Sequence, residues 1–93
     1  MAEMTLSNHV FVGAVQDDTF PEWVSIERIV WVGATNAAHL LEINDTGGKS
    51  VLEPIRAGSA TVDREIPMYG KRAKGLNIVD LDSGVIDIYL RQI

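Results

Sequence analysis

The sequence has 93 residues, no cysteine and a formal net charge of −5 at pH 7. A chain of this length has room for one core, so we expect a single domain over residues 1–93. The lack of cysteine excludes disulfides and thiolate zinc sites, and the acidic balance disfavours nucleic acid as a partner. No apolar run is long enough to span a bilayer, and residues 1–8 lack the pattern of a signal peptide. We therefore expect a soluble protein with neither a membrane nor a nucleic acid among its partners.

Small domains gain stability from disulfides, bound metal or oligomerisation. The chain contains only two histidines, His9 and His39, and neither lies near other ligand-type residues in the sequence. We expect no metal and no cofactor. Oligomerisation is the remaining device, so we expect a homo-oligomer.

The first third of the chain predicts an arm, one strand and an exposed aromatic group. Residues 1–8 are mixed and polar, which indicates a flexible N-terminal arm. Residues 9–15 (HVFVGAV) predict a short strand, with a bulge or close backbone approach at Gly13. The segment Phe20-Pro21-Glu22-Trp23 predicts an exposed loop, because proline disfavours a central strand.

The stretch 25–53 predicts the centre of the fold. Over residues 24–33 strict alternation puts Ile26 on the face opposite to Ile29 and Trp31, and Trp31 is the expected core anchor. Residues 38–43 and 49–55 predict a hairpin whose turn is Asp45-Thr46-Gly47-Gly48. Its second strand carries Pro54, which is typical of a sheet edge.

The last third predicts three more strands. Residues 56–61 form an expected loop, and residues 62–69 an edge strand with Pro67. Residues 70–75 (GKRAKG) predict a basic loop, and residues 76–81 and 85–93 two closing strands. The pattern indicates an all-β domain, a β-sandwich or β-barrel of about seven short, mainly antiparallel strands. A helical turn within residues 34–41 is the alternative for that segment.

The residue patterns that resemble catalytic or ligand motifs are incomplete. Gly48-Lys49-Ser50 lacks the earlier glycine of a phosphate-binding loop, and Asp80 with Asp82 lacks the remaining ligands of a calcium loop. No serine lies in a nucleophile elbow, and both histidines adjoin apolar residues. We predict no catalytic residue and a protein that is not an enzyme.

Two groups of residues remain as candidate partner or oligomer contacts. Lys71, Arg72 and Lys74 form the only local basic cluster, which would suit an acidic partner surface or be a solvated loop. Phe20 and Trp23 are either satellite core or interface anchors.

The strand and turn pattern of residues 29–35, 38–45 and 48–52, followed by 75–79 and 83–90, resembles small all-β structural proteins of tailed bacteriophages. The similarity covers about residues 24–92 and carries over no functional residue. It implies a virion protein of the capsid decoration (cement) type, which sits on the outer capsid shell as a trimer and clamps the major capsid protein.

The hypothesis from sequence is thus a non-enzymatic virion structural protein at the outer capsid surface, most simply a capsid decoration protein. The alternatives are another phage component, from tail, neck or fibre, and a small carbohydrate- or peptide-binding module.

Overall fold

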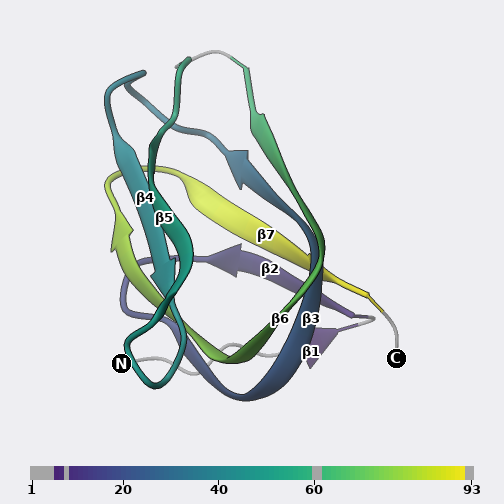
Figure 1. Ribbon diagram of the computed structural model, residues 1–93. Helices are drawn as coiled ribbons and strands as arrows, with labels where there is room; N and C mark the ends of the chain where they lie inside the picture. The colour runs from purple at the N-terminus through teal and green to yellow at the C-terminus, as the bar shows by residue number, and fades with distance from the viewer. Residues whose placement is uncertain (1–5, 8, 60–61, 92–93) are drawn as a thin grey trace.

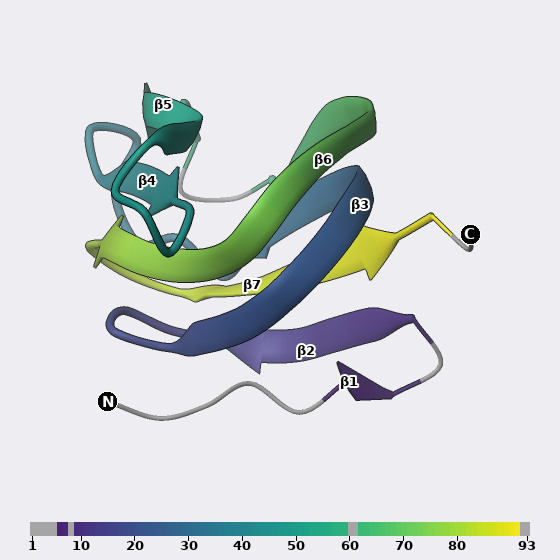
Figure 2. The ribbon, with the colours of Figure 1, turned by 60° about the horizontal axis from the view of Figure 1, so that its bottom comes forward.

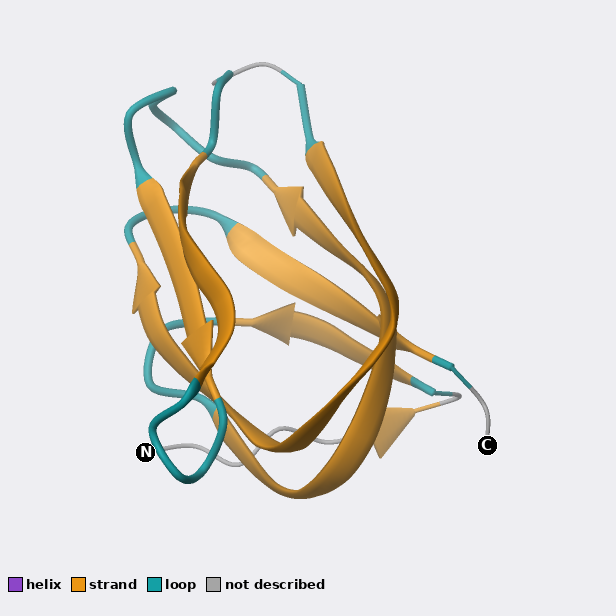
Figure 3. Ribbon diagram, viewed as in Figure 1, coloured by secondary structure: helices purple, strands orange, loops and turns teal. Residues whose placement is uncertain are grey.

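The computed structural model describes residues 6–7, 9–59 and 62–91, and this part of the chain is all-β, as predicted (Figures 1 and 3). No helix in these ranges is long and apolar enough to cross a membrane. The strands are β1 (Leu6–Ser7), β2 (Val10–Ala14), β3 (Thr19–Val32), β4 (Leu40–Asn44), β5 (Ser50–Arg56), β6 (Arg64–Leu81) and β7 (Val85–Leu90).

All seven strands belong to one open antiparallel sheet with the order β1-β2-β7-β3-β6-β4-β5. Two of them are long rather than short, since β3 has 14 residues and β6 has 18. Figure 2 shows both long strands curving, so that the sheet folds over on itself with β4 and β5 on one side and β2 and β7 on the other. One curled sheet therefore supplies both walls of the core.

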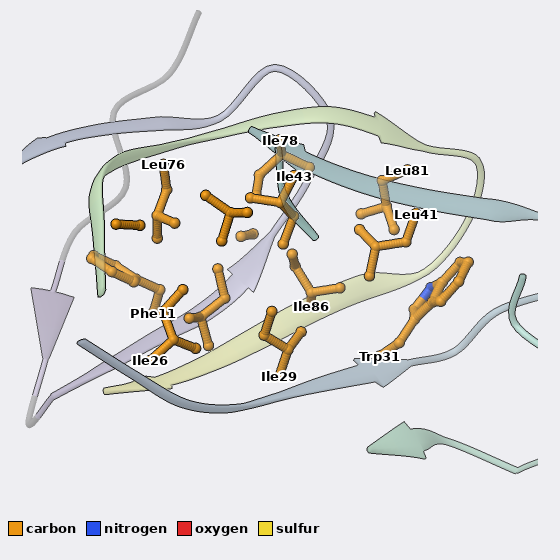
Figure 4. Close-up of a cluster of buried hydrophobic side chains, with 14 of the residues drawn as sticks. Phe11, Ile26, Ile29, Trp31, Leu41, Ile43, Leu76, Ile78, Leu81 and Ile86 are labelled. Carbon is orange, nitrogen blue, oxygen red and sulfur yellow. The ribbon is translucent and has the colours of Figure 1, made fainter. Parts of the chain in front are cut away.

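The core lies between these walls and is almost wholly aliphatic. Side chains of β4 and β6 meet those of β3 and β7, and Phe11 comes from β2 (Figure 4). Trp31 is 1% exposed, which confirms it as a core anchor, and its indole Nε1 donates a hydrogen bond to the carbonyl of Ser83 at 2.8 Å. The largest buried side chains are Phe11, Ile26, Ile29, Trp31, Leu41, Ile43, Leu76, Ile78, Ile86 and Ile88.

A bulge in β3 overturns the predicted division of its faces. Ile26 pairs with Leu90 and Arg28 with Tyr89, so Glu27 is an extra residue opposite β7. An extra residue reverses the alternation beyond it. Ile26 therefore joins Ile29 and Trp31 in the core, where strict alternation separates them.

Several local predictions are confirmed. Gly13 has φ 68°, lies where the β2–β7 register shifts, and donates its N–H to Asp87 Oδ1 at 2.8 Å. The β4–β5 hairpin forms, and Asp45 closes its turn by accepting the N–H groups of Gly47 and Lys49 through Oδ1. β5, which carries Pro54, is an edge strand.

Other predictions are wrong. Residues 20–23 and 70–75 are not loops: they lie within β3 and β6, and these two strands pair with each other. Bulges absorb the irregular residues, since the register shifts between Phe20 and Trp23, where Pro21 sits, and beside Tyr69 and Gly70, which both have positive φ. The alternative of a helical turn in 34–41 is also not found. Of the expected arm, residues 1–5 and 8 lie outside the described residues, while β1 pairs with β2.

Candidate functional site

Three of the five predicted contact residues come together on the outer surface of the β3–β6 ladder. Trp23 pairs with Lys74 and Ser25 with Arg72, so all four side chains point to the same side of the sheet. The guanidinium of Arg72 lies 5.6 Å from the centroid of the Trp23 ring. We call the group Trp23, Arg72 and Lys74 the Trp23 face.

The Trp23 side chain is 58% exposed, although tryptophan is highly buried on average. A second stacked cation in the molecule provides a contrast. Arg28 lies 4.3 Å from the centroid of the Tyr89 ring, but that ring is only partly exposed. The indole of Trp23 thus remains open to a partner while a cation lies beside it.

The other two predicted contact residues point elsewhere. Phe20 is partly buried and packs on the core. The centroids of the Phe20 and Phe11 rings are 4.7 Å apart, and the angle between the ring planes is 57°. Lys71 is next to Arg72 in a strand and therefore points to the opposite side of the sheet. Its Nζ donates to the carbonyl of Val51 on β5 at 2.9 Å.

The pairing of β3 with β6 also determines which charged side chains lie close together on this surface. The basic cluster pairs with residues 23–26 of β3, since Trp23, Ser25 and Ile26 lie opposite Lys74, Arg72 and Lys71. Arg91 Nε donates to Glu27 Oε2 at 2.6 Å, and this hydrogen bond lowers the pKa of the Glu27 carboxyl. Arg72 and Lys74 are exposed, so their charges face solvent on the Trp23 face.

Two hollows flank this region. One has a volume of about 270 Å³, and its lining residues include His9, Glu22, Trp23, Leu90 and Arg91. The other has a volume of about 440 Å³ and lies between β5 and the first half of β6, on the side of the sheet where Lys71 points. Neither hollow could be predicted from the sequence, because both depend on pairing between distant segments.

A third cluster, around His39 and Ser83, was also missed from sequence. His39 Nδ1 and Ser83 Oγ are 2.7 Å apart, and the N–H of Thr35 donates to the same hydroxyl at 3.0 Å. Neither hollow reaches this pair, whose contacts connect the β6–β7 turn to the chain before β4. The arrangement organises the end of the core above Trp31.

Asp80 lies near the end of β6 and Asp82 directly follows the strand, and their side chains share a hydrogen bond. This bond raises the pKa of Asp80, and burial and the charges of Asp82 and Glu42 add to the rise. The N–H of Leu40, which donates to Asp82 Oδ2 at 2.9 Å, lowers the pKa of Asp82 together with the shared bond. Within the described ranges no group of three or more histidine, aspartate or glutamate side chains is arranged to hold a metal ion.

No protein-family model, curated protein or solved structure matches this chain.

Proposed function

We propose that this protein is a non-enzymatic structural protein of a virion, a capsid decoration protein that binds the outer shell as an oligomer through the Trp23 face. The proposal joins two supports. One is the resemblance of the strand and turn pattern to small phage structural proteins, and the other is the surface that β3 and β6 build. The proposal requires that the shell surface bound by the Trp23 face, formed by the major capsid protein, be acidic.

The observation that carries the proposal is the exposed indole of Trp23 beside two cations of β6. Tryptophan and arginine are the side chains that most often dominate binding energy at protein interfaces. Arg72 lies against the ring and Lys74 pairs with it, so the apolar anchor and the charges act at one place. Cations on an otherwise acidic protein select an acidic partner and orient the encounter.

Co-sedimentation with expanded capsid shells tests the proposal. The protein is expected to bind at low salt and to lose affinity as salt rises, because screening weakens contacts between exposed charges. Light scattering on the purified protein is expected to give an integral multiple of the 10.2 kDa monomer mass, with a trimer expected. A clean monomer that stays in the supernatant at every salt concentration would contradict the proposal.

A small carbohydrate- or peptide-binding module is the second candidate, favoured by the hollow beside Trp23. An indole in the lining of a hollow, together with polar side chains, is a typical platform for a ligand with one apolar face. A glycan array followed by ligand-induced thermal shift separates this function from shell binding. Immunogold labelling of virions separates a capsid position from one in the tail, neck or fibre.

A further inference from the structure

The second hollow lies where the curled sheet fails to close. β5 pairs only with β4, and β4 pairs with β6 only over residues 77–81. Within the part of the chain that the structure describes, β5 and the first half of β6 therefore each have one strand edge without a partner. We call the groove between these edges, from Ser50 to Ile55 and from Ile66 to Lys71, the open seam.

Lys71 indicates how wide the open seam is. Its side chain reaches from β6 to the carbonyl of Val51, which must therefore point into the groove rather than toward β4. A fully extended lysine side chain with its hydrogen bond covers about two strand spacings, roughly 10 Å, so the gap at Lys71 is at most that wide. The space for an added strand is the hollow of about 440 Å³ between β5 and the first half of β6.

The floor of the open seam is the core itself. Leu52, Ile55, Ile66 and Met68 are only partly buried and pack on the core, and Val51 beside them is 5% exposed. An added strand presents side chains alternately to the two sides of a sheet. Every second side chain of the occupant would thus cover these residues and remove apolar surface from water.

Two charged residues and two prolines limit which segments can bind in the open seam. The ammonium of Lys71 lies at one end of the groove, whereas Glu53 lies along it and repels acids there. Pro54 and Pro67 lack an N–H and interrupt any longer ladder on either edge. The chemistry therefore selects a short extended segment with a carboxylate at the Lys71 end.

We propose that the open seam binds one extended segment of a partner protein by strand addition, with apolar side chains at alternate positions and a carboxylate that pairs with Lys71. This mode of recognition combines main-chain hydrogen bonds with pockets for alternate side chains. It uses the side of the sheet opposite to the Trp23 face, so it is independent of shell docking. A competing explanation exists for the same features, because prolines and a lysine also protect an open edge from aggregation.

A displayed library of random peptides of about ten residues, selected against the whole protein, tests the proposal. Enriched peptides are expected to carry apolar residues at alternate positions and an acidic residue toward one end. Each is then synthesised, and its Kd is measured by fluorescence anisotropy. Methylation of alternate backbone nitrogens of the peptide is expected to weaken binding at least about tenfold, because it removes ladder donors.

Variants of the protein locate the binding. Lys71→Glu, at an exposed position, is expected to weaken the binding of acidic peptides at least about tenfold and to favour the binding of peptides with lysine instead. Met68→Asp is expected to weaken both kinds, and its matched control is Val12→Asp on β2, where the side chain is 72% exposed. Arg28→Glu is the control for reversal of charge.

Three results would overturn the proposal. The first is a library that yields no enriched peptides. The second is a set of peptides whose affinity is changed neither by N-methylation nor by Lys71→Glu. The third is peptide binding that is lost with Trp23→Ala instead. The first means that the open seam is only a protected edge, and the last assigns the peptides to the Trp23 face. Shell co-sedimentation is measured separately, so failure of either proposal is distinguished from failure of the other.

Discussion

Trp23 on β3 and Lys74 on β6 are direct partners in the antiparallel ladder. The sequence does not show that these two residues form one surface. Trp23 lies in a segment with a proline, and Lys74 lies in a distant basic run between glycines. Pairing places the ring and the charge side by side, and Arg72 adds a second cation at the ring. The candidate interaction surface is thus a product of sheet register.

The two tryptophans are expected to differ sharply in their effect on stability. Trp31→Phe removes the donor to the Ser83 carbonyl in a side chain that is 1% exposed, and we expect a loss of about 1–3 kcal/mol in the free energy of unfolding. Trp23→Phe, at 58% exposure, is expected to change it by less than about 0.5 kcal/mol. Urea denaturation followed by circular dichroism measures both, and equal losses would contradict the assignment of Trp31 as the core anchor.

Gly75 is expected to tolerate no side chain. It has φ +79°, and a Cβ there would collide with the Phe20 carbonyl oxygen and the Thr46 side chain. We expect Gly75→Ala to cost more than about 2 kcal/mol, since backbone strain and displacement add. Gly48 has φ +85° with open space around it, so Gly48→Ala is expected to cost only about 1 kcal/mol. Thermal unfolding that gave both variants the same Tm would show that β3 and β6 do not approach closely at Phe20.

The Asp80–Asp82 pair is expected to make stability depend on pH. The pKa of Asp80 is raised in the folded state. The protonated side chain therefore contributes folding stability that is fully present below the ordinary pKa of 3.8 and is lost as pH rises through the raised pKa. Asp80→Asn supplies a permanent donor to Asp82 and removes the like charge. We expect this variant to be more stable than the wild type at pH 7 and to lose that advantage below about pH 4.

Chemical denaturation between pH 3 and pH 7 measures the effect, with Glu53→Gln on β5 as a control at an exposed carboxylate. Asp82 acts in the opposite direction, because its lowered pKa gives stability that is present above 3.8 and lost as pH falls. Parallel pH profiles for the wild type and Asp80→Asn would show that the two carboxyl groups do not share a proton.

The parts of the fold that sequence predicted are those whose cause is local. The β4–β5 hairpin follows from Asp45 and the glycines after it, and the bulge in β2 follows from Gly13. The sequence predicted Pro67 at a sheet edge. The part of β6 around Pro67 pairs with β3 on one side and, among the described residues, has no partner strand on the other. Each of these features depends on residues within one short segment.

The missed parts depend on contacts between distant segments. Pro21 and Gly70 indicated loops, but each sits at a bulge in a long paired strand. Once residues 70–75 are a strand, alternation separates Lys71 from Arg72, which a loop would not do. The sequence therefore identified the Trp23 face residues singly, while the register that joins them and the open seam came only from the structure.

The most direct test of the account is the equilibrium affinity of capsid shells for variants of the Trp23 face. Trp23→Ala and the charge reversal Lys74→Glu are each expected to weaken binding at least about tenfold, or about 1.4 kcal/mol, at unchanged fold stability. Val12→Ala and Lys49→Glu, both at exposed positions that are not part of the Trp23 face, are expected to bind like the wild type. Affinity that is unchanged in the first pair, or reduced equally in both pairs, would contradict docking through Trp23.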